Sequence, residues 1–108
     1  MATVNYNLNG SELTFQLHPV GTSFRQFAGI YLFLKPRNDG KWNVLYVGES
    51  SDINQRLNTA FQSHQARACA VNKGLTHFGI MTTTGGQQGR ISLETRLRHA
   101  IKLPCNKQ

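Results

Sequence analysis

The chain has 108 residues, 39% of them hydrophobic, and a formal net charge of +7 at pH 7. This length fits one domain with a single core, residues 1–108, and leaves no room within it for a separate recognition domain. A pI near 10.0 favours a polyanionic partner, nucleic acid first, although solubility alone would also account for the charge. We expect no membrane segment, because no apolar run approaches the roughly 20 residues of a spanning helix and no signal pattern precedes the first strand.

Two cysteines, Cys69 and Cys105, stand far apart in the sequence and lack metal-ligand spacing. Isolated thiols of this kind are typical of a reducing compartment. The sequence therefore predicts two free thiols and a cytoplasmic protein.

Residues 2–17 show the alternation of a β-hairpin, with Asn9-Gly10 at its turn. Asn-Gly is typical of a type I′ turn, in which both central residues have positive φ. Such a hairpin, within residues 1–20, would extend a sheet edge, cover a face or form a contact between subunits. The turn predicts two apolar cross-strand pairs, Tyr6 with Leu13 and Val4 with Phe15.

Residues 29–50 indicate a second hairpin, with Asp39-Gly40 as a two-residue turn. This turn places Tyr46 opposite Phe33 and Gly48 opposite Tyr31, so the two tyrosines are diagonal neighbours on one face. Strict alternation then assigns every apolar side chain to a face. One face is expected to carry Tyr31, Phe33, Trp42, Val44 and Tyr46, and the other Ile30, Leu32, Leu34, Leu45 and Val47.

A helix is expected directly after this hairpin. Asp52 is placed to cap it, and Gln55 three residues later completes a capping-box pair. Arg56 lies at the edge of the helix's apolar stripe. The stripe is formed by Ile53, Leu57 and Phe61, which recur at helical spacing.

The remaining elements are two helices and a strand. Ser63 is expected to cap a helix over residues 64–73 that Gly74 ends. Residues 76–84 indicate a strand. Its expected faces are Phe78 and Ile80 on one side and His77 and Met81 on the other.

Residues 84–89, TGGQQG, are expected to be a flexible polar loop without the lysine of a phosphate-binding loop. Ser92 is then expected to cap the last helix, and Pro104 to end it. The buried stripe of that helix is expected to comprise Leu93, Leu97, Ala100 and Ile101. Together the elements predict an α+β domain, a small antiparallel three-stranded sheet flanked by helices, with an extra N-terminal β-hairpin.

The chain resembles the GIY-YIG nuclease superfamily. The resemblance rests on Gly29-Ile30-Tyr31, on Tyr46-Val47-Gly48, on Arg56 ten residues after Tyr46, and on a C-terminal run that begins at Glu94. It covers residues 29–106 and implies a core of strand, strand, helix, strand, helix. It also implies an endonuclease that uses a single Mg²⁺ or Mn²⁺ ion. The catalytic residues that it implies are Tyr31, Tyr46, Arg56, Glu94 and Asn106.

Glu94 is the strongest single candidate for a catalytic residue. Taken alone, it would be a helix partner of Arg98 or a favourable charge near a helix N-terminus. The run that it opens is similar to the family's closing signature, a Glu, a helix, a Pro and an Asn, with Asn106 twelve residues after Glu94. Five acidic residues, three of them suited to turn, cap or hairpin positions, make a two-metal cluster improbable. Glu94 would hold one Mg²⁺, an ion that keeps several waters and needs few protein ligands.

The resemblance implies a role for each of the other candidates. Tyr31 would act as general base or orient the attacking water, and Tyr46 would share its hydrogen bonds. Because a free tyrosine has a pKa of about 10, either would need a nearby cation. Arg56 would bind the scissile phosphate and offset charge in the transition state. Asn106 would either cap the chain end or support the site's hydrogen bonds.

The candidate nucleic-acid contacts are Arg56, Lys35, Arg67 and His64. His64 lies in a region where several family members carry a site histidine or tyrosine, and the alternative is a surface histidine at a helix start. The chain departs from the family in a longer spacer between the two triplets and in Glu49, where some relatives have Lys. Glu49 would weaken phosphate binding or assist the metal.

The sequence thus predicts a small metal-dependent endonuclease that acts on DNA, with branched or nicked DNA as the favoured substrate and RNA as an alternative. Two other functions stay open. One is a noncatalytic nucleic-acid-binding module that keeps the fold. The other is a protein-interaction domain that forms a homo-oligomer through the N-terminal hairpin.

Overall fold

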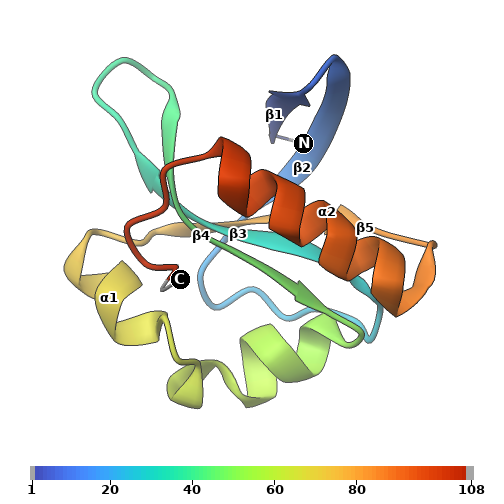
Figure 1. Ribbon diagram of the computed structural model, residues 1–108. Coiled ribbons are helices and arrows are strands. Elements are labelled where there is room, and N and C mark those ends of the chain that lie inside the picture. The colour runs from blue at the N-terminus through green and yellow to red at the C-terminus, as the bar shows by residue number, and fades with distance from the viewer. Residues whose placement is uncertain (1, 107–108) are drawn as a thin grey trace.

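Five antiparallel strands form one sheet in the computed structural model, which describes residues 2–106 (Figure 1). Met1 and residues 107–108, at the bounds of the predicted domain, lie outside the described residues. The strands are β1 (Thr3–Leu8), β2 (Ser11–Pro19), β3 (Gly29–Pro36), β4 (Trp42–Ser50) and β5 (His77–Thr82), in the spatial order β1-β2-β5-β3-β4. The helical segments are η1 (Gln55–Thr59), η2 (Phe61–Ser63), α1 (Arg67–Asn72) and α2 (Gly86–Ala100).

The predicted three-stranded sheet is wrong, although the α+β class is confirmed. β3 lies between β4 and β5, and β2 then pairs with the outer edge of β5 through residues 16–19. Without β2, that edge would leave backbone N–H and C=O groups without partners. The N-terminal hairpin therefore extends the sheet, which is one of the three roles expected for it.

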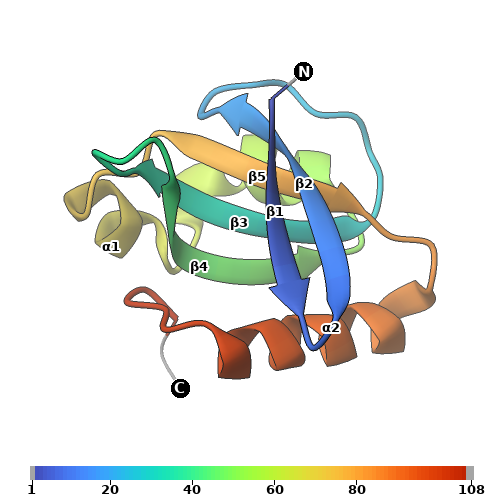
Figure 2. The same ribbon diagram turned by 90° about the horizontal axis from the view of Figure 1, so that it is seen from above.

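The geometry of the N-terminal hairpin is confirmed. Asn9 and Gly10 have φ values of 52° and 88°, as a type I′ turn requires. Tyr6 lies opposite Leu13, and Val4 opposite Phe15. Figure 2 shows β1 and β2 crossing over the other strands toward α2, and the Tyr6 hydroxyl donates a hydrogen bond to the Ala100 carbonyl at 3.4 Å.

The second hairpin keeps the predicted pairing of Tyr46 with Phe33, but its turn is not the predicted one. Pro36 pairs with Trp42, and Gly40, at φ 81°, ends a longer loop in which its N–H donates to the Arg37 carbonyl. The resulting offset of one residue is absorbed by a bulge, because Leu34 pairs with Val44 and leaves Leu45 without a partner.

The bulge changes which face the residues near the turn occupy. Trp42 and Val44, expected beside Tyr46, pack instead on the opposite face, and Leu45 joins the tyrosine face. A bulge has this effect because side chains alternate strictly only while the pairing is regular. The faces predicted for β5 are confirmed, with Phe78 and Ile80 on the tyrosine face and Met81 on the other.

Each face of the sheet is covered by a different helical layer. Figure 1 shows α2 on one side of the sheet and the shorter helical segments on the other. Under the short helices, Tyr31, Phe33 and Phe78 pack against the inward residues Ile53 and Leu57 of the η1 region, as predicted. Under α2, Leu97 packs with the apolar residues of the N-terminal hairpin.

The helices begin and end elsewhere than predicted. Asp52 does cap the first, since its carboxylate accepts from the Gln55 N–H at 3.0 Å. The capping box is not completed, because the Asp52 N–H donates to the Ser50 hydroxyl at 2.9 Å and not to the Gln55 side chain. The helix expected over 64–73 is only α1, because Ser63 bonds back to the Ala60 carbonyl instead of capping.

The last helix, α2, begins six residues before Ser92, so residues 86–89 are helical and not a flexible loop. α2 ends at Ala100, four residues before Pro104. Ala100 is exposed, whereas Leu97 is buried as expected.

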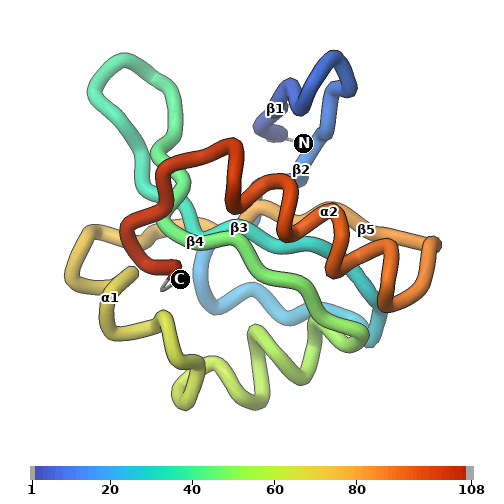
Figure 3. The backbone as a smooth tube through the Cα atoms, viewed as in Figure 1, coloured from blue at the N-terminus to red at the C-terminus, as the bar shows by residue number. Residues whose placement is uncertain are grey.

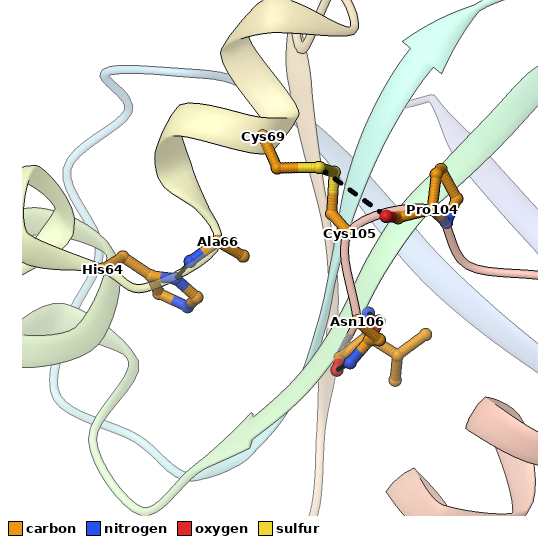
Figure 4. Close-up of a disulfide and its surroundings, with 7 residues drawn as sticks. His64, Ala66, Cys69, Pro104, Cys105 and Asn106 are labelled. Atoms are coloured by element: carbon orange, nitrogen blue, oxygen red, sulfur yellow. Dashed lines mark hydrogen bonds between the residues drawn. A yellow bond between two sulfur atoms is a disulfide. The ribbon is translucent and has the colours of Figure 1, made fainter. Parts of the chain in front are cut away.

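Cys69 and Cys105 form a disulfide, with their Cα atoms 5.7 Å apart (Figure 4). The prediction of two free thiols is therefore wrong, since cysteines 36 positions apart in the chain meet where the C-terminal segment turns back beside α1 (Figure 3). The argument for a reducing compartment falls with that prediction. Within residues 2–106, no helix has the length and apolar character needed to cross a bilayer.

Removing the disulfide should destabilise the fold. A bond that closes a loop of this length contributes roughly 2–4 kcal/mol, mainly by restricting the unfolded chain. We expect Cys69→Ser/Cys105→Ser to lower the free energy of urea unfolding by about that amount. Dithiothreitol should lower the wild-type value similarly and leave the double variant unchanged. A wild type that is indifferent to reductant would contradict the bond.

Candidate active site

One cavity of about 560 Å³ opens where β3 and β4, η1, α2 and the C-terminal segment meet. We call it the tyrosine cavity. It is lined by Tyr31, Tyr46, Glu49, Arg56, Gln65, Cys69, Glu94, Arg98, Cys105 and Asn106. All five catalytic candidates predicted from the sequence are among these residues, so the fold brings together side chains that come from five separate parts of the chain.

Gly48 makes room for Tyr31, the most deeply buried of the candidates. Its side chain is completely buried, and its ring lies over the backbone of Gly48. A Cβ atom at Gly48 would fall on the ring and hydroxyl of Tyr31. At Gly29 a Cβ atom would lie 2.6 Å from the Met81 carbonyl oxygen of the neighbouring strand. Both glycines of the two triplets are therefore required by close packing.

The Tyr31 hydroxyl oxygen accepts two hydrogen bonds. Arg56 Nε donates to it at 3.2 Å, and His64 Nε2 lies 2.7 Å away. The Ala66 N–H donates to His64 Nδ1 at 3.0 Å, so Nδ1 is unprotonated and the neutral ring carries its proton on Nε2. The Tyr31 proton is then left for Tyr46, whose hydrogen bond with this hydroxyl raises the pKa of Tyr31.

Burial decides the protonation of this pair. Burial, with the neighbouring Tyr46, raises the pKa of Tyr31 well above its usual value, and the opposing effect of Arg56 is smaller. Burial also lowers the pKa of His64 to about 4, with the charge of Arg56 adding to the shift. Both side chains are consequently neutral near pH 7.

Glu94 faces the tyrosine cavity from α2, with 17% of its side chain exposed. Burial raises the pKa of Glu94, Glu49 raises it further, and Arg98, 3.7 Å away, opposes the rise. A carboxylate whose negative charge is only partly compensated, beside room for water, fits an ion such as Mg²⁺ that needs few protein ligands. Residues 2–106 contain no group of three or more His, Cys, Asp or Glu side chains arranged for a metal.

Glu49 has a partner that the sequence did not indicate. Arg90, in the first turns of α2, donates from Nε to the Glu49 carboxylate at 3.1 Å, and only 7% of the arginine is exposed. This ion pair offsets the negative charge of Glu49. The glycine-rich run before Arg90 concealed it, because that run reads as a loop.

Asn106 acts on the backbone of β4. Its carboxamide accepts from the Val47 N–H at 2.9 Å and donates to the Val47 carbonyl at 3.0 Å. Because β4 is an outer strand, the side chain takes the place of a further strand beside Tyr46. The Cys105 N–H pairs with the Leu45 carbonyl at 2.9 Å in the same way. Through these bonds Asn106 joins the C-terminal segment to β4, and its support of the site's hydrogen bonds stays a prediction.

The predicted nucleic-acid contacts do not share one surface. Arg56 faces the tyrosine cavity, but His64 is buried, so the alternative of a surface histidine is wrong. Lys35 is exposed and lies outside the cavity. Arg67 packs over the Phe61 ring at 5.7 Å.

Comparison of the chain with protein-family models, curated proteins and solved structures finds no match.

The packing of Tyr31 can be tested at the strand opposite. Gly48→Ala should displace the ring and lower the free energy of unfolding by about 1–3 kcal/mol, the usual cost of overpacking a core. Gly89→Ala is the matched control, because a Cβ atom there has open space. Equal stability of the two variants in urea titrations would show that the ring is not seated on Gly48.

The buried His64 should make the fold sensitive to acid. Because its pKa is about 4 in the folded protein and near 6.5 unfolded, the unfolded chain alone takes up a proton between these values. The free energy of unfolding should therefore fall, by at most about 3 kcal/mol, as pH drops from 6.5 to 4. His64→Gln should show a shallower dependence, whereas His99→Gln, at an exposed position, should match the wild type. Identical slopes for all three would refute the burial of a neutral imidazole.

Proposed function

We propose that the protein is a small divalent-metal-dependent endonuclease of the GIY-YIG type that hydrolyses phosphodiester bonds in DNA. One observation carries the proposal. The five side chains that the resemblance implies as catalytic line one cavity of about 560 Å³. The net charge of +7 supports a polyanionic substrate.

Hydrolysis needs a water aligned with the departing oxygen and positive charge around the phosphate. The water oxygen bonds to phosphorus as the bond to the 3′ oxygen breaks, which leaves a 5′-phosphate and a 3′-hydroxyl. Arg56 has five N–H donors, and its hydrogen bonds to Tyr31 and Tyr46 leave others with which the same guanidinium can bind a non-bridging oxygen. A Mg²⁺ or Mn²⁺ ion bound at Glu94 would supply further positive charge there.

Tyr31 is placed to orient the attacking water. Its raised pKa keeps the phenol neutral in the free protein, and its hydrogen bond with Tyr46 joins two side chains that line the cavity. A base role would require added positive charge, and the two hydrogen bonds from Arg56 and His64 already favour a phenolate. Tyr46 lies beside Tyr31, with ring centroids 6.0 Å apart, and lines the same cavity. Asn106 is a positioning residue that fixes the backbone after Tyr46.

One observation favours a second function, a noncatalytic nucleic-acid-binding module. Arg98 lies 3.7 Å from Glu94 and already compensates part of its charge, which weakens the attraction for a metal ion. In this alternative Arg56 binds phosphate and no bond is broken. A steep salt dependence of DNA binding, with no cleavage in any divalent ion, would identify it.

Two further parts of the proposal concern assembly and location. β1 is an outer strand of the sheet, so a second copy could pair along its free edge; a single monomeric peak on a sizing column would argue against this homo-oligomer. The cytoplasmic location also remains a proposal, and recovery of Cys69 and Cys105 as a disulfide after rapid alkylation in cells would argue against it.

The nuclease proposal is tested with labelled duplex, nicked and branched DNA, and with RNA, in Mg²⁺ or Mn²⁺. We expect cleavage of branched or nicked DNA by the wild type and a loss of at least about 100-fold in Glu94→Gln and Arg56→Gln, the scale of removing one group that stabilises transition-state charge. Glu12→Gln, which removes an exposed carboxylate in the N-terminal hairpin, is the matched control. Cleavage that survives Glu94→Gln would remove the proposed mechanism.

A further inference from the structure

A second cavity, of about 660 Å³, adjoins the tyrosine cavity along β4 and the C-terminal segment. We call it the lysine groove. Leu45 and Pro104 line the groove, while the next residues along the chain, Tyr46 and Cys105, line the tyrosine cavity. Figure 1 shows this C-terminal segment lying between α1 and the end of α2. The C-terminal segment therefore lines both cavities.

The groove has a strong positive charge. Three lysines from different parts of the chain line it, and all three are exposed: Lys35, Lys73 and Lys102. No acidic residue is among its described lining residues. The aliphatic stem of Lys35 runs beside Gly74, next to Lys73 in the chain. The three ammonium groups therefore belong to one site, and an anionic ligand complements them.

The same groove presents aromatic rings. Trp42 lines it and is held edge-on against His77, with ring centroids 4.8 Å apart. Tyr6 lines it from β1 and is fixed by its hydrogen bond to the Ala100 carbonyl. Lysines interleaved with aromatic rings are the pattern of single-stranded nucleic-acid sites, where phosphates contact the cations and bases stack on the rings. A free phosphate would not use the rings, and an apolar partner would leave three lysines without counter-charges.

We propose that the lysine groove binds an unpaired segment of the nucleic-acid substrate, with one base against Trp42 and its phosphates on Lys73 and Lys102. The inference rests on the proposed nuclease function and narrows its substrate. In a duplex the faces of the bases are already stacked, so only a strand with unpaired nucleotides next to the scissile bond can use Trp42. The groove therefore selects DNA with a single-stranded flank, such as a branch or a flap.

Trp42 is the only tryptophan in the chain, so its emission reports directly on the groove. We would titrate the whole protein, in EDTA and without divalent ions, with an eight-nucleotide oligothymidylate. Tryptophan emission and the polarisation of a labelled copy of the same oligonucleotide are followed in parallel. We expect quenching that saturates together with the polarisation. A blunt duplex of equal length should not quench the emission.

Charge variants test which cations are used. Lys73→Gln/Lys102→Gln should weaken oligothymidylate binding about tenfold or more, and reduce the slope of log K against log salt by about 1.4, or about 0.7 for each phosphate that a lysine no longer neutralises. Arg25→Gln/Arg96→Gln removes the same charge at exposed positions outside the groove and should leave the slope unchanged. Trp42→Leu should abolish the emission signal and weaken the binding seen by polarisation by about tenfold.

Three results would overturn the proposal: binding without any change in emission, equal effects of the two charge pairs, or equal quenching by duplex and single strand. The outcome is separable from that of the nuclease proposal. Lysine-dependent quenching in a protein that cuts no DNA would support single-strand binding in the groove and contradict the nuclease proposal. Cleavage of branched DNA by a protein whose tryptophan emission stays constant would support the nuclease proposal and contradict single-strand binding in the groove.

Discussion

The hydroxyl oxygen of Tyr31 is the point on which the rest of the site depends. This oxygen accepts from Arg56 on η1 and from His64 in the segment before α1, so it ties both helical segments to β3. The phenol is enclosed, and an enclosed polar atom must be satisfied by neighbours rather than by water. The glycine opposite, Gly48, gives the ring its place. A tyrosine at this position thus organises the structure and at the same time lines the cavity.

Local rules predicted those parts of the fold in which neighbours in sequence determine the outcome. The Asn9-Gly10 turn specifies its hairpin because both residues adopt positive φ. The central hairpin shows where such rules stop. The predicted pairing of Tyr46 with Phe33 is correct although the predicted turn is wrong. The longer loop shifts the register by one residue, and the bulge at Leu45 shifts it back. A bulge depends on packing against both layers, and nothing in the local pattern of β4 marks it.

The residues of the candidate site could be predicted because they belong to sequence motifs. Some of the side chains around them belong to no motif and could not be predicted. Tyr31, Arg56 and Glu94 belong to recognisable patterns, and the structure brings them to one cavity. Arg90 belongs to no pattern, and its pairing with Glu49 requires knowing that the glycine-rich run before it is helical. The disulfide was missed for a similar reason. Spacing along the chain does not reveal that the C-terminal segment returns to α1, and only a three-dimensional arrangement can show it.

The bulge in β4 also bears on how this domain tolerates change. Because β3 is paired on both sides near Tyr31, the positions of the two phenols are fixed by strands and not by the distant loop. The bulge at Leu45, which has no partner on β3, separates the register at the Tyr46 end of the hairpin from the register at the loop end. Segments could therefore be lengthened or exchanged at residues 37–41, for instance to attach a binding module, without disturbing the arrangement at the other end of the strands.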